Sequence, residues 1–163
     1  MFWSRMLTDG AILSALGGLL IAGSLRANPR IWLNDFPPDI RAAVPPKTTA
    51  EKRQSLMWGV PFLLVLVGVP VWSSYMLKRQ QPEAGFIALF ANAFGVGLFF
   101  NAFDLLVIDW LVLCRFTPRS LIIPGTEGMA GYKNYGHHFR GFVIGIFVAA
   151  FLAALSAAVV SVT

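Results

Sequence analysis

Four long apolar segments dominate the pattern of hydrophobic and polar positions along this chain of 163 residues. Each has close to or more than the ~20 residues that an α-helix needs to cross the ~30 Å hydrocarbon layer of a membrane. Lipid cannot satisfy backbone hydrogen bonds, so segments of this kind must be helical. The sequence therefore predicts an all-α integral membrane protein, a four-transmembrane-helix bundle. The predicted spans are residues 7–25, 55–77, 84–114 and 139–162.

The composition agrees with this fold class. Hydrophobic residues make up 56% of the chain and charged residues only 13%, which lies outside the range of ordinary soluble domains. The two long loops, residues 26–54 and 115–138, are too short to form a separate soluble domain with its own core. We therefore interpret residues 1–163 as a single transmembrane domain with two ordered loops.

The distribution of Lys and Arg predicts how the chain is oriented. The loop 26–54 carries six of them, and the loop 115–138 with its borders carries four. The N-terminus and the short connection 78–83 together carry three. Loops rich in positive charge stay in the cytoplasm, so both long loops are predicted to be cytoplasmic and both termini outside, in the cytoplasmic membrane.

The net charge of +5 does not indicate nucleic acid. The basic residues flank the apolar spans and do not form a dense patch, which is typical of contacts with lipid headgroups. We therefore expect membrane lipids as partners and no nucleic acid.

The first span has a second interpretation. A short apolar run after Arg5, with the small residues 22–24 near its end, is also typical of a cleaved signal peptide. Asp9 interrupts the front of this run, and Arg26 and Arg30 follow it, which opposes export of the following segment. We favour a retained helix, and cleavage stays an open alternative.

Local signals shape the first loop. Its five prolines exclude a long helix between residues 26 and 54. Thr48 and Glu51 form a capping box that predicts a helix start near Thr49. The apolar residues between 31 and 36 are expected at the level of the lipid headgroups.

Small residues recur at every fourth position of the last span. Such a stripe lets another helix approach closely. A similar stripe over residues 10–22 predicts that the first and last spans pack together. The same face is the candidate contact for a homo-oligomer or a larger membrane complex, and the sequence does not separate these alternatives. The stripe begins with Gly141, Gly145, Ala149 and Ala153.

The third span breaks the apolar pattern. An ionised carboxylate in hydrocarbon costs at least ~2.5 kcal/mol, so each acid there needs a partner, a proton or water. On an α-helix, Asn101, Asp104 and Asp109 fit within about 140° of one face. Asp109 is expected to reach Arg140 or His138 in a structural latch. The polar residues of this span are Asn92, Asn101, Asp104 and Asp109.

Asp104 lies deeper, at a level where the spans contain no basic residue. We expect it to be protonated and hydrogen-bonded to Asn101, Ser14 or water, as a buried acid that fixes the helix register. The functional alternative is a relay for protons or cations.

The second loop contains a glycine-rich stretch, residues 123–138, that predicts irregular backbone. Together with neighbouring residues it is a candidate site for an anionic lipid headgroup. The alternative is an ordered lid that seals this end of the bundle. The candidate ligand-binding residues are Asn101, Tyr132, Lys133, Tyr135, His137 and Arg140.

The sequence gives little support for a metal site, a bound cofactor or a catalytic nucleophile. The chain has two histidines, and adjacent residues on a helix diverge by ~100°, so we expect no metal site and no cofactor. Cys114 is embedded in an apolar helix end, and no Gly-x-Ser-x-Gly motif is present. The candidate catalytic residues are therefore Asp109, His138 and Asp104.

Three functions stay open at this point, and the sequence does not decide whether the chain is an enzyme. The expected function is a small non-catalytic membrane subunit or a lipid- or ligand-binding protein, whose carboxylates should be paired and sealed. One alternative is a lipid-modifying enzyme with Asp109 and His138 as proton carriers and Arg140 on the headgroup, which needs an accessible cavity. The other is a small proton-coupled transporter or channel through Asp104, which needs a polar path past Asn92.

Overall fold

The computed structural model describes residues 2–162, and of Phe2 only the backbone. Within this range every regular element is helical, and four helical segments are long and apolar enough to cross a membrane. The predicted all-α bundle is therefore confirmed. The long elements are α1 (Phe2–Ala27), α3 (Thr49–Gln80), α4 (Phe86–Phe103), its continuation η2 (Asp104–Phe116) and α5 (Tyr135–Ser161). The loops contain η1 (Pro29–Asp35), α2 (Pro38–Ala42), η3 (Arg119–Leu121) and η4 (Ala130–Lys133).

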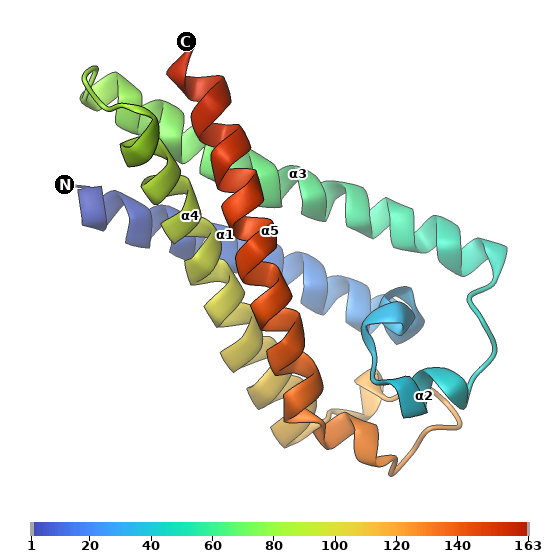
Figure 1. Cartoon of the computed structure of the whole chain (residues 1–163). Coiled ribbons are helices and arrows are strands. Elements are labelled where there is room, and N and C mark those ends of the chain that lie inside the picture. The colour runs from blue at the N-terminus through green and yellow to red at the C-terminus, as the bar shows by residue number, and fades with distance from the viewer. Residues whose placement is uncertain (1, 163) are drawn as a thin grey trace.

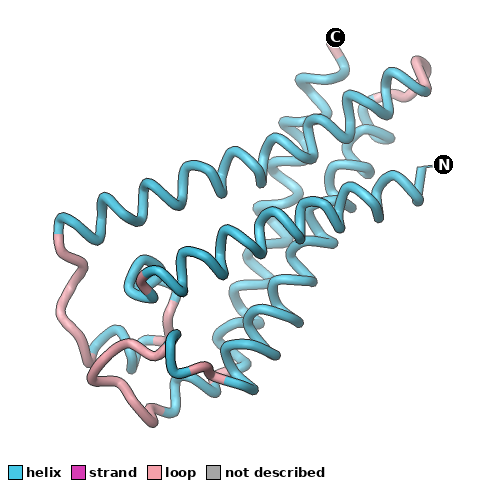
Figure 2. The backbone as a smooth tube through the Cα atoms, turned by 180° about the vertical axis from the view of Figure 1, so that it is seen from behind, coloured by secondary structure: helices cyan, strands magenta, loops and turns pink. Residues whose placement is uncertain are grey.

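The bundle has two different ends (Figure 1). Both termini and the short turn between α3 and α4 lie at one end, which we call the hairpin end. The two long loops lie at the other, the loop end. The helices α1 and α3 diverge from α4 and α5 toward the loop end, as both views show (Figures 1 and 2). The loops fill part of this angle.

The predicted pairing of the first and last spans is wrong. Both small-residue stripes pack against α4 instead, so α4 is the central helix of the bundle. On α1, Gly10 faces the Phe99 side chain; on α5, Gly145 faces Asn101 and Ala149 contacts Gly97. A small-residue face permits close approach but does not determine which helix packs against it. Here side chains of α4 pack into the small-residue faces of both α1 and α5. A homo-oligomer through the Gly141 to Ala153 face stays a prediction.

Substitution of Gly10 tests this packing. A Cβ atom at Gly10 would lie 2.8 Å from the Cβ of Phe99, which is attached directly to the backbone, so Gly10→Ala must push α1 away from α4. Overpacking of this kind lowers the free energy of unfolding by about 1–3 kcal/mol. On α3, a Cβ at Gly68 meets no atom within 4 Å, so Gly68→Ala should be neutral or stabilising by up to ~1 kcal/mol.

Thermal unfolding in detergent, followed by circular dichroism, measures the difference between the two alanine variants. Equal midpoints for Gly10→Ala and Gly68→Ala would contradict the close contact between α1 and α4.

The two loops pack against each other through an apolar cluster, which we call the loop cluster. It joins Leu33, Phe36 and Ile40 of the first loop to Ile123 and Tyr132 of the second. Leu33 and Phe36 are therefore buried between the loops, and their position at the level of the lipid headgroups stays a prediction. The loop end is an ordered structure, in agreement with a lid.

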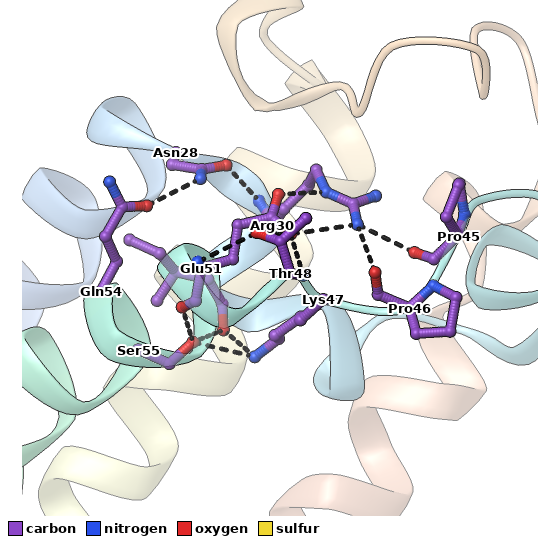
Figure 3. Close-up of polar contacts among 10 residues, drawn as sticks. Asn28, Arg30, Pro45, Pro46, Lys47, Thr48, Glu51, Gln54 and Ser55 are labelled. Atoms are coloured by element: carbon purple, nitrogen blue, oxygen red, sulfur yellow. Dashed lines mark hydrogen bonds and ion pairs between the residues drawn. The ribbon is translucent and has the colours of Figure 1, made fainter.

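The first loop is also pinned to the start of α3 (Figure 3). The predicted capping box is present, because Thr48 Oγ1 accepts a hydrogen bond from Glu51 N at 3.2 Å and Thr48 N donates to Glu51 Oε2 at 2.7 Å. Arg30 forms an ion pair with Glu51, and Lys47 Nζ donates to Ser55 Oγ at 3.1 Å. These contacts hold the first loop against the start of α3.

Candidate functional site

A cavity of about 550 Å³ lies at the loop end, in the angle between α1 and α3 on one side and α4 and α5 on the other. Every long helix and both loops contribute to its wall. One part of the wall is apolar, and the other collects most of the polar residues of the spans. Its apolar lining includes Ile21, Leu25, Trp32, Phe62, Leu105, Ile108 and Ile144, and its polar lining includes Asn34, Asp35, Asn101, Asp104, Asp109, Tyr132, His137, His138 and Arg140.

The third span does not continue as an α-helix, in contrast to the prediction. From Asp104 to Phe116 it is a π-helix, which ends where Thr117 N donates to Val112 O at 2.9 Å and Thr117 adopts φ 46°. In an α-helix, residues five apart have side chains that point in directions differing by about 140° around the helix axis. In a π-helix they are joined by a hydrogen bond and lie on the same side. The wider helix therefore turns both Asp104 and Asp109 toward the cavity.

Asp109 and His138 are in direct contact. The distance between His138 Nδ1 and Asp109 Oδ1 is 3.0 Å, and the two side chains are 12% and 20% exposed, respectively. Asn134 caps the first turn of α5 by accepting from His137 N at 2.9 Å, and this turn presents His138 to η2. Of the two latches that the sequence allowed, the one to His138 is present. Arg140 lies exposed on the cavity wall and has no ion-pair partner among residues 2–162.

The other histidine has a different role. His137 Nε2 lies 3.0 Å from the backbone oxygen of Asp35, so its ring ties the first loop to α5. The rings of His137 and His138 contact each other edge to face, with centroids 5.5 Å apart and planes inclined by 86°. Among the described residues, no three side chains of His, Cys, Asp or Glu come together in a way that could hold a metal ion.

Two further carboxylates share the cavity wall, those of Asp35 and Asp104. Partial burial raises the pKa of Asp35; the charge of Asp109 acts in the same direction, and Lys47 opposes it. Asp104 forms no hydrogen bond through its carboxyl group within the described chain. Its expected partners are engaged elsewhere, since Asn101 Nδ2 donates to Phe142 O at 2.9 Å and Ser14 Oγ donates to Gly10 O at 2.8 Å.

The candidate ligand residues of the second loop separate into two groups. Tyr132 lines the cavity, and its hydroxyl accepts from Ile123 N at 2.9 Å. Tyr135 lies outside, with its ring 5.8 Å from that of Trp110. Lys133 also lies outside, because its Nζ donates to Cys114 O at 2.6 Å and caps the carbonyl end of η2. The cavity thus brings together Asn101, Tyr132, His137 and Arg140, but not Lys133 or Tyr135.

Asp35 lines this site but was not among the ligand-binding or catalytic residues predicted from the sequence. It comes from the first loop, far along the chain from the third and fourth spans. The signal available was an acidic residue inside an apolar, proline-bordered segment, which is unusual for a solvated loop. Its position across from Asp109 depends on the docking of the two loops, which no local pattern encodes.

No protein-family model, curated protein or solved structure matches this chain. Function is therefore inferred from the cavity itself. Its wall supplies an Asp109–His138 pair, the carboxyl groups of Asp35 and Asp104, and the Arg140 guanidinium. Such a wall can exchange protons with a ligand, hydrogen-bond to hydroxyl or amino groups, and bind one anionic group.

Proposed function

We propose that this protein binds a membrane amphiphile with its headgroup in the cavity, and that Asp109 and His138 perform acid–base chemistry on that headgroup. The observation that carries the proposal is the contact of 3.0 Å between these two residues on the wall of an accessible cavity. Its volume of about 550 Å³ is within the range of small-molecule sites, which hold ~300–1,000 Å³.

The shape of the opening supports an amphiphile. Ile144 lies on the cavity wall and is 64% exposed on a membrane-spanning helix, so the cavity reaches the apolar flank of the bundle. Asp35 and Arg140 are exposed at the loop end of the same cavity. A molecule with a polar head and an apolar tail matches this distribution of surfaces. It can enter from the membrane without leaving its lipid environment.

The polar wall suggests the chemistry. Asp109 holds Nδ1 of His138 and so orients the imidazole, which also has the buried thiol of Cys114 beside it. We infer that the Asp109–His138 pair exchanges a proton with the headgroup. The carboxyl groups of Asp35 and Asp104 accept hydrogen bonds from hydroxyl or amino groups. Arg140 binds an anionic group such as a phosphate. Cys114 is fully buried and does not line the cavity, so it offers no nucleophile.

The other functions receive less support. A packing subunit should have sealed and paired carboxylates, yet Asp104 lies on the wall of an accessible cavity. A transporter through Asp104 needs a polar path that continues past Asn92. Toward the hairpin end, Val96 and Phe100 are buried in the core, and Asn92 is fully buried with its Nδ2 donating to Ser73 Oγ at 2.8 Å.

A non-catalytic lipid-binding protein is the second candidate. It uses the same cavity, and the observation that favours it is that the Asp109–His138 contact joins η2 to α5. In this function the pair is a structural latch and the bound amphiphile leaves unchanged.

Native mass spectrometry of protein purified in mild detergent tests amphiphile binding, with Gly141→Trp as the blocking variant. Gly141 lines the cavity, and a Cβ there meets no atom within 4 Å, so an indole ring can fill the cavity without a backbone clash. We expect the wild type to retain one more lipid-sized mass than Gly141→Trp, namely the molecule bound in the cavity.

Gly68→Trp is the matched control, because Gly68 also has open space around it but lies on α3 away from the cavity. It should retain the same mass as the wild type. A wild-type chain that emerges without any bound amphiphile, or equal retention by both tryptophan variants, would overturn the proposed binding.

A further inference from the structure

A second hollow, outside the cavity described above, lies where the first loop meets α3. Its volume is about 600 Å³, and its wall includes Arg41, Lys47, Lys52 and Leu56. We call it the basic groove. It lies beside the region drawn in Figure 3, in which Lys47 and Ser55 connect the loop to α3.

The charge of the basic groove has one sign. Three cationic side chains, and no carboxylate among the described residues, line it. Of the acids that act on Lys47, Asp35 lines the other cavity, and Glu51 is already engaged by Arg30 and by the capping box. The charged side chains on the wall of the groove are therefore all positive.

Two of the cations are held in place. Lys47 Nζ donates to the backbone oxygen of Ile31 and to Ser55 Oγ, and Arg41 Nη1 donates to Asn34 O at 3.4 Å. Burial lowers the pKa of Lys47, and this effect outweighs the opposing charges of Asp35 and Glu51. An anion in the groove would add to the partial charge compensation that Asp35 and Glu51 give Lys47.

The groove changes from basic to apolar along α3. Lys52 and Leu56 are one helical turn apart, and Val60 continues the same side of the helix. Leu56 is 66% exposed and Val60 is also exposed, on a helix that is long and apolar enough to span a membrane. The succession of cations and then exposed apolar residues matches a phospholipid, with its phosphate on the cations and its acyl chains along α3.

We propose that the basic groove binds an anionic phospholipid, with Arg41, Lys47 and Lys52 on the headgroup and Leu56 and Val60 along an acyl chain. This site is separate from the cavity that holds Asp109 and His138. It would anchor the first loop, and with it one wall of that cavity, to the membrane surface.

The test is lipid titration of delipidated protein in native mass spectrometry, with phosphatidylglycerol compared with phosphatidylcholine. Each Lys or Arg near a membrane surface contributes about a fivefold preference for anionic lipid. We expect the wild type to prefer phosphatidylglycerol, Lys52→Gln to lose about fivefold of this preference, and the triple variant R41Q/K47Q/K52Q to lose about 100-fold.

The matched control is R53Q/R115Q/R119Q, which removes three exposed cations from the loop end without touching the groove. It should keep the preference. Since Lys47 also anchors the loop, the single variant Lys52→Gln keeps the test valid if the triple variant unfolds. The ammonium group of Lys52 has no hydrogen bond or ion pair among residues 2–162, whereas its backbone N–H donates to Thr48 O. Equal losses in the groove variants and the control would overturn the proposal.

Two further arms identify the ligand and the site. Inorganic phosphate at millimolar concentration should not displace phosphatidylglycerol, because phosphate lacks the acyl chains; complete displacement would show a site for soluble anions and overturn the proposal.

The preference for phosphatidylglycerol should persist in Gly141→Trp, whose cavity is blocked. Its loss in that variant would assign the lipid to the cavity and overturn a separate site, whereas failure of the cavity to bind leaves the basic groove unaffected.

Discussion

Asp109→Asn is expected to leave an amphiphile bound in the cavity while slowing its conversion by about 10²–10⁴-fold, the usual contribution of a general acid–base group. The amide has nearly the same shape as the carboxylate and can still contact His138. It carries no charge, however, so it cannot stabilise the imidazolium that forms when His138 takes a proton. Binding and turnover should therefore separate in this variant.

Untargeted mass spectrometry of lipid extracts, from cells that express the wild type or Asp109→Asn, measures the change. The wild type should deplete one lipid class and enrich another, and Asp109→Asn should show neither effect. Glu83→Gln is the control, because Glu83 is exposed at the hairpin end, away from the cavity. Identical lipid profiles for the wild type and Asp109→Asn, with the amphiphile still bound to both, would identify a non-catalytic binding protein.

Ile40→Ala is expected to lower the stability of the loop end by about 2–5 kcal/mol, the range for truncating a fully buried aliphatic side chain. Ile40 has 0% of its surface exposed and packs in the loop cluster, between residues of both loops. The substitution leaves an apolar void that the surrounding loops can fill only by moving apart. Since Tyr132 and Phe36 belong to this cluster and also line the cavity, one wall of the site should loosen as well.

Hydrogen–deuterium exchange of peptides from residues 29–44 and 119–133 reports this local opening. Both peptides should exchange faster in Ile40→Ala, while peptides from α4 should be unchanged. Ile87→Ala is the control, because Ile87 is 81% exposed near the hairpin end and its truncation leaves no void. Unchanged exchange in Ile40→Ala would mean that the loops do not depend on the loop cluster for their order.

The helices were predictable because their causes are local. The four long helices were predicted by comparing the length of each apolar span with the thickness of a membrane. The start of α3 was predicted from the capping box of Thr48 and Glu51. The contact of Asp109 with His138 was predictable for a related reason: an acid near the end of one span must find a partner at the start of the next.

The errors have non-local causes. The stripes on α1 and α5 were recognised, but both pack on α4, since any helix with suitable side chains can fill a small-residue groove. Lys133 was a candidate ligand residue, and the structure places it outside the cavity, where it caps η2 because the carbonyl groups at that helix end need a donor. The π-helix itself shifts each backbone hydrogen bond by one residue, a change that leaves no trace in the composition of the span.

The amino-acid sequence by itself determined that this chain forms four apolar helices and carries a few acids within them, because hydrophobic length and the cost of charge in lipid act residue by residue. Only the tertiary structure decided that Asp35, Asp104, Asp109, His138 and Arg140 share one cavity. That arrangement requires the π-helix to turn two acids to one side and the two loops to dock on each other. Both depend on contacts between segments far apart along the chain, and these contacts exist only in the folded bundle.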